Sequence, residues 1–311
     1  MAQLAQTTAS REQQEQQDSR VARLRDLFEL VFRLVMYVII IFVFATPLIW
    51  ALGNSFRQTE QIWGNLFPIS WRTFIPLSDE FTVLNYVEAL GFGAEARGLG
   101  YDMGNALWIS VASALVVVGL SLIFNTCAAY FFARLRFPGK NFLLVFVIAT
   151  MMIPQQITVI PLFFVVDQLN MINTFWALVV PFYASPFIIF ALTQFFEEIP
   201  RELDEAATID GANLFQILWR VIVPVSLPGL LTVSLLEFQF IWNNFYWPLV
   251  AVSSKELFPV NVALAVQFTD QVPQWGRVFA ATVIASLPVV VLFAFLQRYY
   301  FESITISGMK G

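Results

Sequence analysis

The chain has 311 residues, of which 58% are hydrophobic, only 13% are charged and 33 are phenylalanine. Soluble domains carry about twice that share of charged residues, so the composition indicates a polytopic membrane protein rather than two soluble domains. The formal net charge is −5 and the sequence has no basic patch, which argues against nucleic acid as a partner.

The residue types also exclude most catalytic and metal chemistry. The sequence has no histidine, and its single cysteine, Cys127, lies inside an apolar stretch. The commonest acid/base catalyst and metal ligand is therefore missing, and no cysteine cluster replaces it. Gly139-Lys140 is followed by Asn141 and lacks the upstream glycine of a phosphate loop. We expect no metal, no cofactor and no catalytic centre, and any ATP that drives this protein is expected to bind another chain.

Residues 1–26 are predicted to form a disordered tail, because residues 1–20 are rich in Gln, Ser, Thr and Glu and offer almost nothing to bury. Residues 27–311 are predicted to form one all-α transmembrane domain. A helix needs about 20 apolar residues to cross a bilayer, and six segments suggest spans. These are residues 34–56, 105–133, 141–160, 174–196, 226–252 and 278–301. Pro154 is expected to break or kink the third of them.

The lysines and arginines predict the orientation of these spans. Most of the 17 lie before the first span, after the second, in the segment 197–224 or after the last, whereas few lie in the predicted loops 57–102 and 253–276. Positively charged residues concentrate on the cytoplasmic side of membrane proteins. Both termini and the segment 197–224 are therefore predicted to be cytoplasmic.

The segment 197–224 is a polar island between two apolar blocks, and it reads as a helix, a break and a second helix. Pro200 suits a first helical position, and acidic residues follow it at the positive end of the helix dipole. Gly211 is expected to end the first helix in the left-handed conformation, and Asn213 is expected to cap the second. Ala206, Ala207 and Gly211 carry almost no side chain, so the surface of another protein can approach closely.

The spacing of Glu205-Ala206-Ala207, Gly211 and Pro224 resembles the EAA loop of the membrane subunits of ABC importers. In that family the loop inserts a coupling helix into a cleft of the ATPase. The family usually has Ile and Leu where this chain has Val221 and Val223. Further similarity to carbohydrate importer permeases of the maltose type lies in residues 85–86, 133–139, 242–249 and 308–311.

The resemblance implies a permease subunit that imports a sugar, an oligosaccharide or a sugar-like solute across a bacterial or archaeal cytoplasmic (inner) membrane. Its implied partners are a second permease subunit, an ABC ATPase dimer, an extracytoplasmic solute-binding protein that contacts residues 253–276, and membrane lipid. Carried over to this chain, the ATPase-docking residues are Glu205, Ala206, Ala207, Gly211, Gly308 and Lys310.

Amides and aromatic rings near the membrane spans suggest a path for the solute. Amides bond sugar hydroxyls, and aromatic rings stack on C–H faces, although aromatic residues also form the interface belt of any membrane protein. The candidate residues are Asn243, Asn244, Gln155, Gln156 and Tyr246.

Glu237 is the only acidic residue well inside a predicted span. A charged carboxylate at the centre of a bilayer costs about 2.5–3.5 kcal/mol, so Glu237 is expected to face a water-filled path, a partner or a hydrogen-bond donor, or to be protonated. The alternative function is accordingly a stand-alone proton-coupled secondary carrier that uses Glu237. A structural hydrogen bond to a neighbouring helix is the simpler role.

Overall fold

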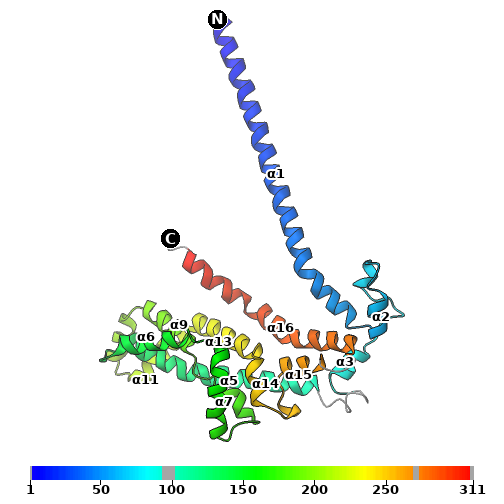
Figure 1. Ribbon diagram of the computed structural model, residues 1–311. Coiled ribbons are helices and arrows are strands. Elements are labelled where there is room, and N and C mark those ends of the chain that lie inside the picture. Colours follow the sequence, from blue (N-terminus) through cyan, green and yellow to red (C-terminus); the bar gives the residue numbers. More distant parts are fainter. Residues whose placement is uncertain (1, 93–101, 269–272, 309–311) are drawn as a thin grey trace.

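The computed structural model describes residues 2–92, 102–268 and 273–308, and this part of the chain contains helices and turns but no strand (Figure 1). The helices are α1 (Ala2–Asn54), α2 (Thr59–Gly64), α3 (Leu84–Ala89), α5 (Met103–Arg134), α6 (Lys140–Thr150), α7 (Gln155–Gln168), α8 (Phe175–Val179), α9 (Pro186–Glu198), α10 (Glu202–Ile209), α11 (Leu214–Ile217), α12 (Val223–Val225), α13 (Leu227–Trp242), α14 (Tyr246–Ala251), α15 (Val260–Gln267) and α16 (Trp275–Gly308). The predicted all-α class is confirmed for these residues.

Three helices are long and apolar enough to cross a membrane, at Arg25–Asn54, Met103–Arg134 and Trp275–Phe295. They correspond to the first, second and sixth predicted spans. Two bent helix pairs pass the same test, so the described residues hold three to five candidate spans. Six separate spanning helices are not seen.

The third predicted span is broken where Pro154 stands. Helix α6 ends at Thr150, α7 begins at Gln155, and the two axes are bent by 101°. Proline lacks the backbone N–H that a continuous helix needs and clashes with the preceding turn, so the predicted break has a local cause.

The fourth predicted span, 174–196, is not one helix, which corrects the prediction. It consists of the short helices α8 and α9 with a non-helical stretch between them, and α9 starts at Pro186. Pro181 and Pro186 each remove a backbone donor, so the chain between them cannot continue a regular ladder. The fifth predicted span, 226–252, is likewise divided, because α13 ends at Trp242 and α14 starts at Tyr246.

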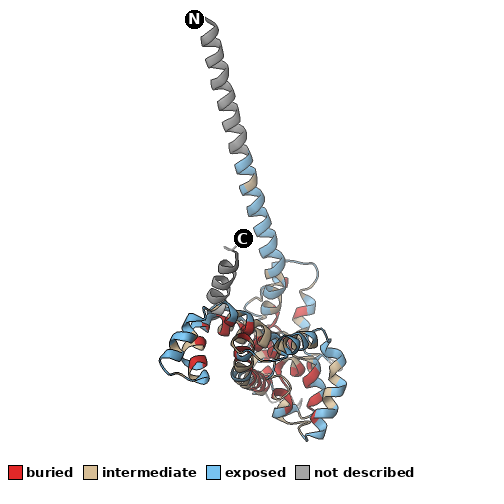
Figure 2. Ribbon diagram, turned by 90° about the vertical axis from the view of Figure 1, so that its left-hand side faces the viewer, coloured by how far each residue is buried: buried red, intermediate tan, exposed pale blue. Residues whose placement is uncertain are grey.

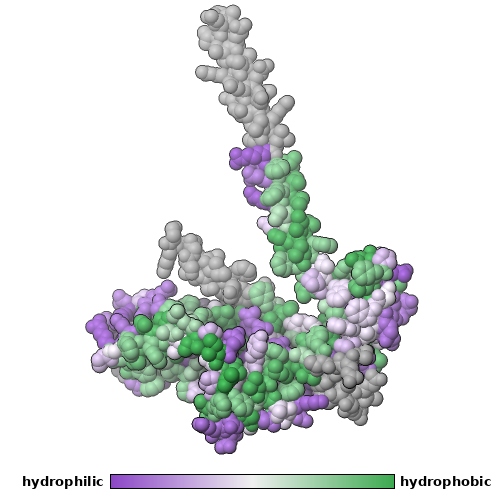
Figure 3. Space-filling model, viewed as in Figure 1, coloured by the Kyte–Doolittle hydropathy of each residue, from purple (hydrophilic) through white to green (hydrophobic). Residues whose placement is uncertain are grey.

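Helix α1 includes residues 2–26, where the composition predicts a disordered tail. Glutamine, glutamate, alanine and arginine are good helix formers, and a helix that extends from an existing span needs no new nucleus. From residue 27 onward the side chains of this helix are mostly exposed (Figure 2). A hydrophobic band covers its membrane-spanning part (Figure 3), which leaves that band free to face lipid or a partner.

The core of the molecule lies around α5, which packs against α8, α9, α13 and α15. Most of its buried side chains are small, and they recur every three to four residues, so they form one face of the helix. Small residues let neighbouring helices approach closely, which is how helices associate in membranes. The buried face includes Ala106, Ser110, Ser113, Val117, Ser121 and Asn125.

Candidate functional site

The segment 197–224 has the predicted helix, break and second helix. Acidic residues occupy the first turn of α10, and Gly211 follows its end with a φ of 83°. Asn213 caps α11 through a reciprocal pair of bonds, in which the Gln216 backbone N–H donates to Asn213 Oδ1 at 3.0 Å and the Asn213 N–H donates to Gln216 Oε1 at 2.9 Å. The left-handed glycine and the cap were both predicted from local chemistry.

This loop presents small residues to the outside. Glu205, Ala206 and Gly211 are exposed, and a Cβ placed on Gly211 would meet nothing within 4 Å. Ala207 is half-buried and packs on the core cluster beneath the loop. Two large apolar side chains of the same segment are also exposed, Ile209 at 86% and Phe215 at 62%. Exposed carboxylates such as Glu202 and Glu205 lie on the same helix as Ile209, so the loop offers both apolar and acidic groups to a partner.

An ion pair connects the loop to α5. Arg134, the last residue of α5, places Nε 2.7 Å from Oδ2 of Asp204 in α10, and the two side chains are only 5% and 19% exposed. Arg134 Nη2 also donates to the Ile199 carbonyl at 2.9 Å, and Arg201 donates to the Ala133 carbonyl at 3.4 Å. Helix α10 is therefore tied to the end of the central helix.

The electrostatics of this pair suggest a positioning role. Burial raises the pKa of the Asp204 carboxyl above its ordinary value, although the positive charges of Arg134 and Arg201 act in the opposite direction. Desolvation thus offsets much of the attraction, as is usual for buried ion pairs. The pair therefore fixes the position of α10 relative to the end of α5, and as a whole it adds little net folding stability.

A second contact between α5 and a distant part of the chain is made by Asn125, which is 1% exposed. Its Nδ2 donates to the Tyr183 carbonyl at 3.1 Å, and its Oδ1 accepts from the Ser185 backbone N–H at 3.1 Å. These bonds satisfy backbone groups in the break between α8 and α9. Neither Asn125 nor Arg134 was among the predicted site residues, although an amide in the middle of a charge-free span is a signal that was available in the sequence.

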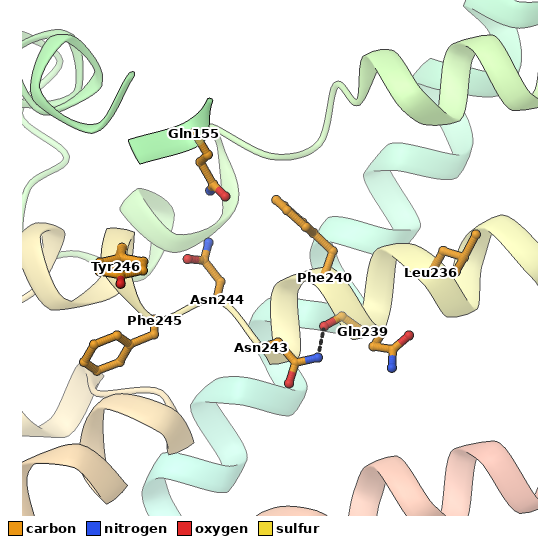
Figure 4. A pocket seen from close by; sticks show the side chains of 8 residues that line it. All are labelled: Gln155, Leu236, Gln239, Phe240, Asn243, Asn244, Phe245 and Tyr246. Carbon is orange, nitrogen blue, oxygen red and sulfur yellow. Dashed lines mark hydrogen bonds between the residues drawn. The ribbon is translucent and has the colours of Figure 1, made fainter. Parts of the chain in front are cut away.

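A cavity of about 420 Å³ opens where α13 breaks before α14 (Figure 4). In Figure 4 the amides of Gln155 and Asn244 point toward one another, with the ring of Phe240 beside them. Asn243 Nδ2 donates to the Gln239 carbonyl at 2.9 Å, which holds the end of α13. The lining residues are Gln155, Leu236, Gln239, Phe240, Asn243, Asn244, Phe245 and Tyr246.

Four of the six residues predicted for the solute path thus come together, namely Gln155, Asn243, Asn244 and Tyr246. Gln156 is exposed next to the cavity but does not line it, and Glu237 lies on the buried face of α13 with 4% exposure. Leu236, Gln239, Phe240 and Phe245 were not predicted. Leu236, Gln239 and Phe240 precede Asn243 and Asn244 at helical spacing, which is a signal that points to these three.

The two predicted docking residues of the C-terminal segment are only partly described. Gly308 is the last residue of α16, and Lys310 lies outside the described residues.

The chain matches the family described as "Binding-protein-dependent transport system inner membrane component" over residues 125–305. The arabinooligosaccharides transport system permease protein AraQ of Halalkalibacterium halodurans is 32% identical over 276 residues, covering 88% of this chain and 94% of that protein. The trehalose/maltose transport system permease protein MalG of Thermococcus litoralis is 31% identical over 270 residues, covering 85% and 91%.

The fold has a counterpart among solved structures. A crystal structure of a bacterial ABC transporter involved in the import of the acidic polysaccharide alginate contains a chain with a TM-score of 0.75 and 22% identity, covering 87% of this chain and 95% of that chain. At that identity the likeness shows the fold alone. Because the family match covers more than half of the chain and relatives above 30% identity span most of it, the chain belongs to the binding-protein-dependent inner membrane components, the permease subunits of ABC importers.

Proposed function

We propose that this permease subunit moves a sugar, an oligosaccharide or a sugar-like solute into the cytoplasm, driven by ATP hydrolysis on a partner ATPase. The observation that carries the proposal is the exposed loop that presents Glu205, Ala206 and Gly211 at its surface. The sugar-transport permeases among its relatives support the solute class. Membership of this family favours an ABC permease over a stand-alone carrier that uses Glu237.

The complex contains, in this proposal, a second permease, an ATPase dimer and an extracytoplasmic solute-binding protein. Residues 197–224 and both termini face the cytoplasm, and residues 253–276 contact the binding protein on the other side. Glu205, Ala206, Ala207 and Gly211 dock on the ATPase, and Gly308 and Lys310 reach the ATPase dimer. Mild-detergent purification from the native host tests this assembly, and a chain that purifies without an ATPase contradicts it.

In this proposal, movement of the docked loop is transmitted to the membrane-spanning helices through α5. Closure of the ATPase dimer shifts α10, and the Arg134–Asp204 pair passes that shift to the end of the central helix. The ATPase can shift α10 only if it binds the two positions of this helix with different affinities. A rigid contact between α10 and α5 keeps that difference from being dissipated by independent motion of the loop.

We expect Asp204→Asn to lower the amount of solute moved per ATP about fivefold, the lower end of coupling free energies between sites. The amide keeps the shape but loses the charge that pairs with Arg134. The ATPase is expected to co-purify as in wild type. The melting temperature of the complex is expected to fall by a few degrees, because Arg134 keeps a buried charge without its ionised partner. Reconstituted proteoliposomes give both uptake and hydrolysis.

Asp210→Asn is the matched control, because Asp210 is an exposed carboxylate at the end of the same helix. It is expected to leave the ratio of uptake to hydrolysis unchanged. An unchanged ratio in Asp204→Asn as well contradicts the proposed joint, whereas loss of the ATPase from this variant assigns the residue to docking.

The cavity is the proposed solute path through this subunit. Its 8 lining residues provide four amides, three aromatic rings and a leucine, and no charged side chain. Amides donate and accept hydrogen bonds with hydroxyls, and rings offer flat apolar faces. This lining favours an uncharged, hydroxyl-rich solute over an acidic one.

We expect the double variant Gln155→Ala and Asn244→Ala to raise the KM for uptake of an arabinooligosaccharide or maltose probe about 10- to 30-fold. Each lost hydrogen bond costs about 1 kcal/mol, and about 1.4 kcal/mol is tenfold. Gln156→Ala is the matched control, because Gln156 is the neighbouring amide outside the cavity. An equal KM for both variants contradicts the proposed path.

A further inference from the structure

Residues 55–92 follow α1, and we call them the outer segment. This segment is organised around Arg57, whose side chain is fully buried. Its Nε donates to Glu80 Oε2 at 3.0 Å, its Nη1 to Asn54 Oδ1 at 3.1 Å, and its Nη2 to the Ile75 carbonyl at 2.8 Å. The carbonyls of Arg72 and Thr73 accept further bonds from the same guanidinium. One side chain thus connects the end of α1 to residues spread over the segment 72–80.

This frame is also fixed to the membrane helices. Asn85 Nδ2 donates to the Ser55 carbonyl at 2.8 Å and to the Arg57 carbonyl at 2.7 Å. A Cβ on Gly276, at the start of α16, would lie 2.1 Å from the Arg57 carbonyl oxygen, and one on Gly53 would lie 1.7 Å from that of Phe74. The backbones therefore touch, and the segment is held against the outer ends of α1 and α16.

On this frame a cluster of large apolar side chains faces outward, which we name the outer apolar edge. Its exposed fractions are 53% for Trp63, 76% for Phe67, 70% for Ile69, 58% for Trp71 and 55% for Ile75. Residues 61–77 carry one charge, that of Arg72, whose guanidinium lies 5.8 Å from the centre of the Trp71 ring. Single exposed hydrophobic residues are ordinary, but a contiguous group needs an occupant.

Two features of the edge favour lipid as that occupant. The edge continues the apolar band of α1, whose Leu48, Ile49 and Leu52 are exposed immediately before it, and α2 lies beside that end of α1 in Figure 1. The edge combines tryptophans with an arginine, the residue types that sit at the headgroup level where spans leave the bilayer. Within residues 61–77 Arg72 is the one charged residue, and exposed carboxylates stand only at the two ends of this stretch, at Glu60 and Asp79.

We propose that the outer apolar edge inserts into the outer leaflet of the membrane, with Trp63, Phe67, Ile69 and Trp71 among acyl chains and headgroups. The Arg57 frame holds the edge at that depth and so anchors the outer end of α1 beside α16. The choice of the outer leaflet rests on the orientation given under the proposed function, whereas insertion itself is independent of ATPase docking and of the solute path.

A fluorescent probe at Phe67 tests the insertion. Cys127→Ser removes the single cysteine of the chain, so that Phe67→Cys provides one labelling site for an environment-sensitive probe. The control is Ser78→Cys, at an exposed polar position of the same outer segment. The assembled complex, with the reactive cysteines of its partners removed, is placed in vesicles of phosphatidylethanolamine and phosphatidylglycerol. Nitroxide lipid quenches from the membrane, and iodide quenches from water.

We expect nitroxide lipid to quench the probe at Phe67 several-fold more than the probe at Ser78, and iodide to show the reverse order. Equal access of iodide to both probes overturns the proposal. So does shielding of the Phe67 probe only after the solute-binding protein is added, which assigns the edge to that protein. Shielding from both quenchers without the binding protein assigns the edge to the partner permease and overturns the proposal as well.

Discussion

The double variant Glu205→Arg and Gly211→Val is expected to purify with its partner permease but to lose the ATPase, with recovery reduced by more than about tenfold. Gly211 has a φ of 83°, where a β-branched residue costs about 1–2 kcal/mol, and Glu205 is exposed on the docking face. Truncating or reversing a central interface residue often costs about 2 kcal/mol or more. Mass spectrometry of the purified complex measures the recovery, and uptake is expected to fall in parallel.

The matched control is Glu198→Arg with Gly139→Val. Gly139 has a φ of 82° with open space around its Cβ position, and Glu198 is an exposed carboxylate at the end of α9. The control therefore carries the same charge reversal and the same backbone strain outside α10. Full ATPase recovery in the docking variant contradicts the proposed docking, and equal loss in both variants attributes the effect to strain rather than to the interface.

Arg57→Met is expected to cause the largest loss of stability, lowering the melting midpoint of the complex by roughly 5–10 °C. Removal of one partner from a buried ion pair costs about 3–5 kcal/mol, since the remaining charge loses its compensation. Arg57 and Glu80 are 0% and 14% exposed, and the carbonyl of Ile75 also loses its donor. Thermal denaturation monitored by size-exclusion chromatography gives the midpoint.

Arg72→Met is the control for this change. Arg72 is an exposed arginine of the same segment that lies over the Trp71 ring, a contact worth about 0.5–1 kcal/mol at such a site. Its midpoint is expected to stay within about 2 °C of wild type. A similar melting midpoint for the Arg57 and Arg72 variants shows that the buried Arg57 side chain does not stabilise the outer segment.

The contacts between Arg57 and Glu80 also predict how the folding stability depends on pH. Burial raises the pKa of Glu80, but hydrogen bonds from Asn65 and the Leu77 backbone, together with the charge of Arg57, outweigh burial and leave the pKa below its ordinary value. Such a carboxylate stabilises the fold above its ordinary pKa, and this contribution is lost as pH falls through the lowered value. The acid-induced loss is therefore expected to be smaller in Arg57→Met than in wild type.

Local chemistry was sufficient to predict the apolar part of α1, the helices α5 and α16, and the helix, break and second helix of the segment 197–224. Long apolar runs have few structures open to them in a membrane other than a helix, because every backbone N–H and C=O needs a partner. Gly211 and Asn213 act on the backbone next to them, so their effect is readable from neighbouring residues. The break at Pro154 is local in the same sense.

Other features depend on residues far apart in the chain. The fourth predicted span looks continuous by hydropathy, yet it is divided where Asn125 supplies hydrogen bonds to the backbone at Tyr183 and Ser185. Pro181 and Pro186 interrupt the helix there, and the amide from another helix satisfies backbone groups in the interruption. Hydropathy registers neither the prolines nor such a bond, which is why the fourth span was predicted as one helix.

The sequence by itself determined the all-α class, three helices long and apolar enough to span a membrane, the shape of the segment 197–224 and four of the cavity residues. Each of these follows from interactions within about one turn of a helix or from burial of an apolar run. Only the tertiary structure decided the Arg134–Asp204 joint, the hub at Arg57 and the gathering of Gln155 with Asn244. Those contacts depend on which segments become neighbours in the folded chain, and local spacing does not encode that.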